Sequence, residues 1–231
     1  MTGGKLNIDI KWPCELHEKT KFHLIEIAHP IRANQLTVAF PGLIYIHSGS
    51  IACFSSNIHL NNSIALIFSK GDWGGTQTIC SDGYAPSIYF EELTPSKIFS
   101  FPKKKIENIL DDNMEIYKFL FYISQKVNRF SLQLGSNFLH DIIARTVYVL
   151  LCLCSQDRMA GSKKYNIKIT QQKLSELIGI SRPRLNETLK VLESTGDIIL
   201  SHGKIVVLNA ISLKMRLHNF HYMYNDPYPN E

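Results

Sequence analysis

The sequence predicts an α+β protein with a β-rich first half, a helical middle and a C-terminal part that combines helices with a β-hairpin. Short apolar runs broken by Gly, Pro, Asn and Ser fill residues 22–101, and this spacing favours an antiparallel sandwich or barrel. The clearest runs are Leu43–Ile46, Ile51–Phe54, Ile64–Phe68 and Ile88–Phe90. Between residues 103 and 154 the apolar side chains recur at helical spacing instead.

A long helix is predicted from about Lys103 to Leu134, where apolar residues form an unbroken seam. Successive seam residues are four, three, four, three and four positions apart, which is the a/d pattern of a coiled coil. The seam consists of Ile116, Leu120, Ile123, Val127, Phe130 and Leu134. It would pair two copies of the chain or pack on the chain's own β-rich part. Gly135-Ser136 is expected to end the helix, and a second helix is expected from Asn137 to Cys154.

Two short helices with a tight turn between them are predicted after residue 169. Thr170 suits a helix N-cap because its hydroxyl can accept a bond from a first-turn amide. Gly179 stands where a tight turn needs a positive φ. Ser181 can cap the second helix, and Pro183 in its first turn removes no needed amide.

The second of these helices has an apolar face and a basic face. Leu185, Leu189 and Leu192 are spaced to pack on the first helix. The other face carries Arg182, Arg184, Asn186 and Lys190. Arginine can form two hydrogen bonds to guanine, and asparagine can do so to adenine.

Gly196 is expected to end this helix, and two short strands should follow, Ile198–Leu200 and Ile205–Leu208. The turn between these strands would be His202-Gly203, which makes a β-hairpin. An ordinary helical hairpin followed by a β-hairpin has the same spacing, so the pattern alone leaves that alternative open.

The stretch from Ile169 to Leu208 resembles the DNA-binding domain of the cyclic-AMP receptor protein / fumarate–nitrate regulator (Crp/Fnr) family. The opening of the family motif stands here as Ile169-Thr170, Leu174, Ile178-Gly179 and Ser181-Arg182. Its closing part stands as Leu189, Leu192-Glu193 and His202-Gly203-Lys204-Ile205-Val207. The resemblance implies an N-terminal cyclic-nucleotide-binding-like β jelly roll, a long dimerisation helix and a C-terminal winged helix-turn-helix. We expect these parts over residues 1–102, 103–136 and 137–210, with a C-terminal extension over 211–231.

The resemblance also implies a function, namely sequence-specific transcription regulation by a cytoplasmic homodimer on a near-palindromic operator. Its partners would be double-stranded DNA and a second copy of the chain, with RNA polymerase as a further candidate. In this family the equivalent long helix pairs with that of the second copy, so the seam from Ile116 to Leu134 is expected to be the dimer interface. The expected DNA-binding residues are Thr170, Gln171, Ser181, Arg182, Arg184, Asn186, Lys190 and Lys204. Many family members carry a cytosine-reading glutamate directly after the recognition arginine. Here that position is Pro183, so the family's best-known target sequence does not carry over.

The ligand pocket implied by the resemblance is degenerate in this sequence. Lys70-Gly71-Asp72-Trp73-Gly74-Gly75 resembles the family's turn before the pocket. In cyclic-AMP binders a glutamate that binds ribose and an arginine that pairs with the cyclic phosphate follow this turn. Counting on from Gly75 places Thr76 at the glutamate and Pro86 at the arginine, while Ser87 matches. Proline offers neither charge nor an amide donor, so we expect cyclic AMP not to be the ligand.

Composition agrees with a globular DNA-binding protein but does not establish it. The net charge is +5, and residues 160–231 hold ten Lys/Arg against six Asp/Glu, a net of +4. The first twenty residues lack an apolar signal segment, and the five scattered cysteines favour a reducing cytoplasm. A protein-interaction module would have the same winged fold, and loss of salt dependence in binding would favour it.

Motifs for catalysis or for a cofactor are missing from the sequence. It holds no P-loop and no Gly-x-Ser-x-Gly nucleophile elbow, so we expect neither an enzyme nor a metal site. The fumarate–nitrate branch binds an iron–sulfur cluster through clustered N-terminal cysteines. Only Cys14 lies near this N-terminus, so no cofactor is expected. A redox-sensing role for Cys14, Cys53 or Cys80 stays open.

Overall fold

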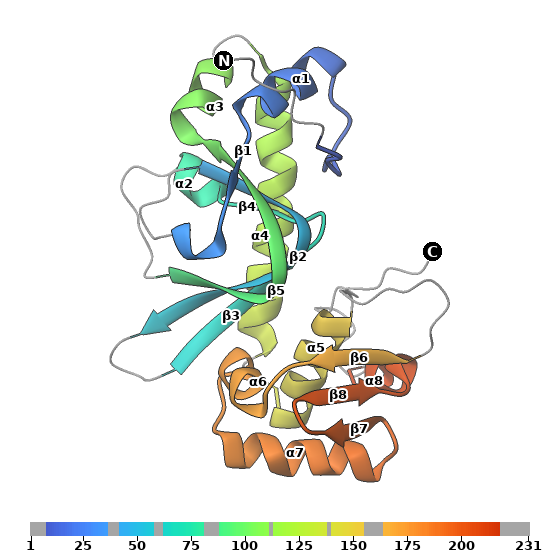
Figure 1. The fold of residues 1–231 in the computed structure, drawn as a ribbon. Coiled ribbons are helices and arrows are strands. Elements are labelled where there is room, and N and C mark those ends of the chain that lie inside the picture. Colours follow the sequence, from blue (N-terminus) through green and yellow to red (C-terminus); the bar gives the residue numbers. More distant parts are fainter. Residues whose placement is uncertain are drawn as a thin grey trace. The chain divides into compact units, whose positions relative to one another are not determined.

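The structure is a computed structural model that describes residues 8–36, 42–57, 62–80, 88–110, 113–137, 140–154 and 164–217 (Figure 1). The chain divides into two compact units. The first comprises Met1–Cys53 and Phe68–Phe130, and the second comprises Phe54–Ile67 and Ser131–Glu231. Among the described helices, none combines the length and the apolar character that a membrane span requires.

The N-terminal part contains the antiparallel sheet that the apolar runs predicted, with helices before and after it. The sheet order is β1-β5-β2-β3, and β4 pairs with β2. Its strands are β1 (His29–Ile31), β2 (Gly42–Asn57), β3 (Asn62–Ser69), β4 (Trp73–Gly74) and β5 (Ile88–Pro102). The helices are α1 (Glu18–Ile27), the 3-10 turn η1 (Ala33–Gln35), α2 (Thr76–Cys80), α3 (Lys103–Leu110) and α4 (Glu115–Asn137).

Two of the predicted short strands are one continuous strand. The runs Leu43–Ile46 and Ile51–Phe54 both lie in β2, which passes through Gly49 without a turn. Gly49 has a φ of +74°, and a Cβ atom built there would lie 2.2 Å from the carbonyl oxygen of Pro95 on β5. The glycine therefore permits the close approach of β2 to β5.

An aromatic cluster forms the centre of the first unit's core. The ring centroid of Trp73 lies 4.8 Å from that of Tyr45 and 5.0 Å from those of Phe101 and Phe119. The indole Nε1 of Trp73 donates to the carbonyl oxygen of Lys11 at 3.0 Å, so its polar group is satisfied inside the core. The Trp of the turn motif thus has a packing role.

The predicted long helix is two helices, α3 and α4. The backbone N–H of Glu115 donates to the side-chain oxygen of Asn113 at 3.0 Å, which gives α4 a new start after α3 ends at Leu110. The other expected boundary is also displaced, because α4 continues through Gly135-Ser136 to Asn137. A glycine inside a helix costs only about 1 kcal/mol relative to alanine, so it need not end one. The following helix, α5, begins at Ile142.

The a/d seam of α4 packs on the chain's own first unit, which corrects its interpretation as a dimer interface. Ile116, Leu120, Ile123 and Val127 are buried in the same core cluster as Trp73. Phe130 is half-buried and Leu134 is buried. A seam at spacings of three and four is also the stripe that any helix needs to cover a sheet, so the pattern could not separate the alternatives.

The second unit confirms the predicted helix pair and hairpin and adds two elements. Leu185, Leu189 and Leu192 are fully buried, as their spacing predicted. The three-stranded sheet has the order β6-β8-β7, so the hairpin β7–β8 gains an unforeseen strand, β6. Helix α8 crosses the expected boundary at residue 210. The elements are α5 (Ile142–Cys154), β6 (Tyr165–Lys168), α6 (Gln171–Ile178), α7 (Arg182–Ser194), β7 (Ile198–Ser201), β8 (Lys204–Val207) and α8 (Ala210–Met215).

Candidate nucleic-acid interface

The turn between α6 and α7 has the local structure that its residues predict. The hydroxyl of Thr170 accepts a hydrogen bond from the backbone N–H of Lys173 at 3.1 Å, which caps α6. Gly179 ends the helix with a φ of +71°, and its N–H donates to the carbonyl oxygen of Ser175 at 2.9 Å. Ser181 is the N-cap residue of α7, but its exposed side chain makes no capping bond.

Arg145 supports this turn from α5, which the sequence did not indicate. Its Nη2 atom donates to the carbonyl oxygen of Ile178 at 2.6 Å and to that of Gly179 at 3.4 Å. These carbonyls end α6, where the helix dipole favours a positive charge. Burial lowers the pKa of the Arg145 guanidinium from its usual value. An arginine at this spacing before the motif is too general a signal to identify from sequence.

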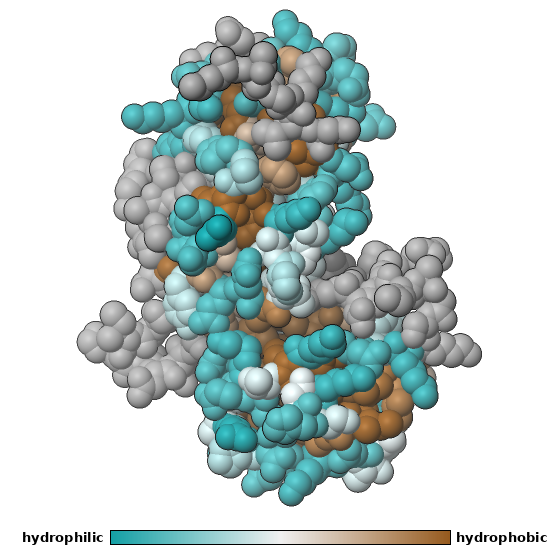
Figure 2. Space-filling model, in the orientation of Figure 1, coloured by the Kyte–Doolittle hydropathy of each residue, from teal (hydrophilic) through white to brown (hydrophobic). Residues whose placement is uncertain are grey.

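The outward surface of α7 follows from its buried stripe. Successive residues are rotated by about 100°, so the positions opposite Leu185, Leu189 and Leu192 form the outward face. That face is occupied by four residues, all of them exposed, namely Pro183, Glu187, Lys190 and Ser194. In Figure 2 hydrophilic residues predominate along α7.

Arginines border this outward face on both sides. Arg182 and the partly exposed Asn186 are four residues apart and lie along one side. Arg184 lies on the other side and lines a groove of about 620 Å³ that Arg145 and Gln172 also line. Glu187 was missed, although its spacing from the leucine stripe would have shown it to point outward.

The open end of the three-stranded sheet carries two lysines. Lys168 of β6 lies opposite Lys204 of β8 in the strand register, so both side chains extend from the same side of the sheet. Lys168 is exposed and Lys204 partly exposed. The His202-Gly203 turn connects β7 to β8, and Gly203 has a φ of +66°. Lys168 was not among the expected DNA-binding residues, because β6 was not predicted.

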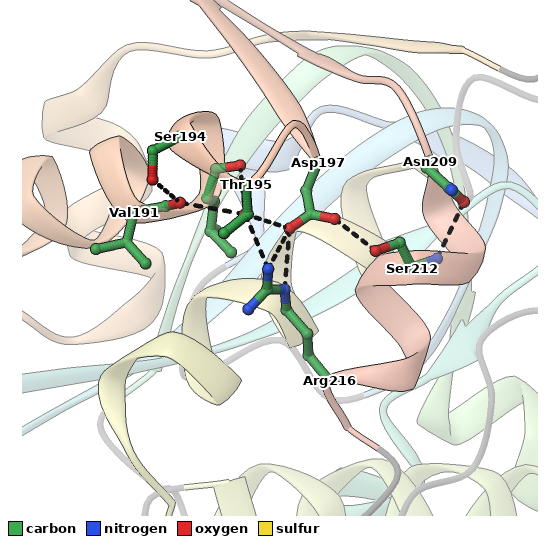
Figure 3. Close-up of polar contacts among 8 residues, drawn as sticks. Val191, Ser194, Thr195, Asp197, Asn209, Ser212 and Arg216 are labelled. Atoms are coloured by element: carbon green, nitrogen blue, oxygen red, sulfur yellow. Dashed lines mark hydrogen bonds and ion pairs between the residues drawn. The ribbon is translucent and has the colours of Figure 1, made fainter.

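Asp197, at the junction of α7 and β7, is the centre of a buried polar network (Figure 3). Its carboxylate accepts hydrogen bonds from the Thr195 hydroxyl at 2.7 Å and the Ser212 hydroxyl at 2.6 Å. Arg216 donates to it from Nε at 2.9 Å and from Nη2 at 2.6 Å. Burial alone would raise the pKa of Asp197, but these bonds and the charge of Arg216 outweigh it and lower the pKa.

All of the expected DNA-binding residues lie in the second unit and are exposed or partly exposed. Figure 1 shows α7 beside the strand pair β7–β8 of the same unit. The expected residues are Thr170, Gln171, Ser181, Arg182, Arg184, Asn186, Lys190 and Lys204. The unit therefore combines a helix with a basic border and a sheet end with two lysines.

In the described residues, the turn at the start of the segment matched to the family's ligand pocket packs tightly against a neighbouring part of the chain. Gly75 has a φ of +90°, and a Cβ atom there would lie 2.2 Å from the carbonyl oxygen of Gly42. Thr76, at the position of the ribose-binding glutamate, is buried. Pro86 and Ser87 lie outside the described residues.

Two of the cysteines considered for redox sensing have unreactive surroundings. Burial raises the pKa of the Cys53 thiol to about 12, and burial likewise raises the pKa of Cys14. Thiolate is the reactive form, so neither residue is set up as a redox sensor. The side chain of Cys80 lies outside the described part. Within the described ranges, no three His, Cys, Asp or Glu side chains gather as a metal site would require.

Comparison with known proteins places the chain among bacterial regulators. A Crp-like helix-turn-helix domain model matches residues 144–216. The cAMP-activated global transcriptional regulator CRP of Pasteurella multocida is 26% identical over 168 residues, covering 72% of this chain and 80% of that protein. The protein of the same name from Escherichia coli O157:H7 is 27% identical over 168 residues, which again cover 72% of this chain and 80% of that protein.

Solved structures share the fold. A transcriptional regulator of the Crp/Fnr family from Eubacterium rectale aligns with a TM-score of 0.66 at 15% identity, covering 87% of this chain and 94% of that one. The c-di-GMP-responsive regulator CLP of Xanthomonas campestris aligns with a TM-score of 0.65 at 16% identity, covering 83% and 99%. Together, the domain model, the curated relatives and the shared fold support a DNA-binding transcription regulator of the Crp/Fnr family.

Proposed function

We propose that this regulator binds a near-palindromic DNA site as a homodimer without requiring cyclic AMP. The observation that supports DNA binding most directly is the exposed surface of α7. Arg182 and Asn186 border one side of its outward face, and Arg184 borders the other. A helix with such a surface can enter the major groove, where arginine pairs with guanine and asparagine with adenine.

The base-reading residues in this proposal are Arg182, Asn186 and Glu187. Arg182 stands at the start of α7, and in helix-turn-helix proteins the N-terminal residues of this helix contact base edges. The exposed carboxylate of Glu187 would accept a hydrogen bond from the amino group of cytosine. Pro183 leaves the position before Arg184 without a polar side chain, so the preferred sequence should differ from that of relatives with glutamate there.

The phosphate-binding residues are the basic and polar groups around this helix. Lys168 and Lys204 extend from one sheet end, and Arg184 stands at the groove beside α6. Lysine and arginine contacts to phosphate position a protein on DNA without reading sequence. The proposed set is completed by Thr170, Gln171, Ser181 and Lys190.

The dimer would form through the exposed face of α4, since its a/d seam is occupied. Tyr117, Phe121 and Tyr122 are 52%, 59% and 46% exposed, and they lie on the side away from the buried seam. Large apolar side chains exposed along one helix face favour a protein partner. In a helix-turn-helix dimer the two recognition helices occupy successive major grooves, about 34 Å apart.

Independence from cyclic AMP is supported by the residues around Gly75. A buried Thr76 replaces the ribose-binding glutamate, and the tight turn at Gly75 leaves no room for a side chain against Gly42. The curated relatives are named as cAMP-activated, so this is a proposed difference from them. As a DNA reader the protein would act in the cytoplasm, with RNA polymerase as a further partner.

The test is selection of bound DNA from a random pool by the purified full chain, at two salt concentrations and with no ligand added. We expect an enriched near-palindrome whose half-sites are one helical turn apart, and binding that weakens at higher salt. Enrichment that appears only after addition of cyclic AMP would overturn ligand independence. Retention of DNA without sequence enrichment under both conditions would overturn the base-reading roles.

A further inference from the structure

The junction between the recognition helix α7 and the wing, defined as β7, β8 and the His202-Gly203 turn, is fixed by main-chain bonds. The N–H of Asp197 donates to the carbonyl oxygen of Leu192 at 3.1 Å. The N–H of Leu208 donates to the carbonyl oxygen of Asp197 at 2.9 Å. The glycine before the junction, Gly196, has a φ of +76° and no atom within 4 Å of its missing Cβ. A flexible residue thus lies beside the point where the wing begins.

The side chain of Asp197 adds a second constraint from an element beyond the wing. Arg216 follows α8 and donates from two nitrogens to one carboxylate oxygen, and Ser212 of α8 donates to the other. Nη2 of Arg216 also donates to the Thr195 hydroxyl at 2.8 Å, which ties in the end of α7. Figure 3 shows the guanidinium directed at both residues.

The helix that supplies these donors is itself held in place. The side chain of Asn209 accepts a bond from the N–H of Ser212 at 3.0 Å and caps α8. Leu213 and Leu217 are buried, whereas Ile211 and Met215 on the other side are exposed. The buried leucines fix α8 on the second unit, so Arg216 and Ser212 reach Asp197 from a stable base.

We propose that Arg216 is a positioning residue for DNA binding, which holds the wing at a set angle to α7 by bracing Asp197. The inference rests on the proposed DNA-reading function and adds a residue outside the helix-turn-helix to it. Its guanidinium is held by Asp197 and Thr195, so we assign it an indirect role that is exerted through Lys204 of the wing.

Helix α7 and the wing should depend to different degrees on the contact between Arg216 and Asp197. Helix α7 is held by three fully buried leucines and keeps its place without Arg216. In sequence, only Thr195, Gly196 and Asp197 connect α7 to the wing, so losing the Arg216 donors should loosen the wing relative to α7. The main-chain bonds at the junction and the bond from the Leu200 N–H to Glu193 would keep the wing attached. Loss of Arg216 should therefore weaken phosphate contacts and leave base preference unchanged.

The experiment is a double-mutant cycle with the full chain and a DNA duplex that wild-type protein has selected. The variants are Arg216→Met, Lys204→Ala and their combination, with Arg216→Lys as the conservative variant and Lys104→Met, an exposed lysine of the first unit, as the charge control. The dissociation constant is measured across a salt series, and base preference is measured by competition with single-substituted duplexes. Thermal melting reports folding.

Each variant loses one phosphate contact in each protomer of the dimer, so we expect Arg216→Met and Lys204→Ala each to reduce the salt slope by about 2. The double variant should show no larger a reduction than either single variant. The conservative variant Arg216→Lys cannot make the two-nitrogen contact and should restore the slope only in part. Additive effects on the slope, or a folded Arg216→Met protein with the wild-type slope, would overturn the proposal.

A second substitution covers the case in which Arg216→Met fails to fold. Ser212→Ala removes one donor to Asp197 and should reduce the salt slope in the same direction by less. An unchanged slope in folded Ser212→Ala would count against the brace. If the wild-type chain selects no DNA sequence at all, the proposed DNA-reading function fails before any variant is measured. Failure of that function can therefore be told apart from failure of the proposed role of Arg216.

Discussion

The guanidinium of Arg145 donates a 2.6 Å hydrogen bond to the carbonyl oxygen of Ile178, the last residue of α6. This bond joins α5 to the end of the first motif helix, three residues before Ser181, the N-cap of α7. The backbone that sets the direction of Arg182 is therefore fixed from a helix outside the motif.

Removing this contact should destabilise the second unit. Arg145→Met leaves the Ile178 carbonyl without its charged donor, and a hydrogen bond to a charged group contributes roughly 2 kcal/mol. Urea unfolding should show a loss of about that size in the free energy of unfolding. Arg145→Lys retains a cation and should lose less, and equal losses in the two variants would argue against a charge at the helix end.

Glu187→Gln should alter base preference at one position of each half-site. The carboxylate accepts hydrogen bonds only, whereas an amide also donates, so preference for cytosine should fall by roughly 1–3 kcal/mol at that position. Competition with duplexes that differ at single base pairs measures the change. Glu193→Gln on the same helix is the control, because its carboxylate is already bound to the N–H of Leu200. An unchanged profile for Glu187→Gln would remove its base-reading role.

Asp197 should make stability depend on acid pH. Its pKa is lowered in the folded chain from an ordinary value of 3.8, so its contribution is complete above that value and is lost as pH falls through the folded pKa. Asp197→Asn should therefore cost roughly 3 kcal/mol at pH 7, with the gap to wild type closing below about pH 4. Unfolding by urea at pH 7, 5 and 3 measures the gap, and a constant gap would contradict the assignment.

The exposed face of α4 should carry the dimer contact. Phe121→Glu places a charge on this face and should shift the chain toward monomer with little change in monomer stability. Sedimentation equilibrium measures the shift. Ile123→Ala, in the buried seam, should instead lower the free energy of unfolding by roughly 2–5 kcal/mol. An intact Phe121→Glu dimer would place the interface elsewhere.

The sequence determined much of this protein because several signals were local. Thr170, Gly179 and Pro183 define the ends of α6 and α7 through their own backbone chemistry. The spacing of the buried leucines in α7 defines which side of that helix faces inward. The motif around them then indicated the family, and the comparisons confirmed it. Capping and periodicity act within a few residues, so they can be read without knowing the fold.

Only the tertiary structure decided which surface each periodic face meets. The a/d seam of α4 suits a second helix as well as a sheet, and the aromatic cluster around Trp73 made it part of the core. Lys168 and Arg216 became relevant because strand pairing and a buried carboxylate bring them to the wing from distant positions. Long-range contacts of this kind depend on the whole packing arrangement, and a single sequence does not record which partners will meet.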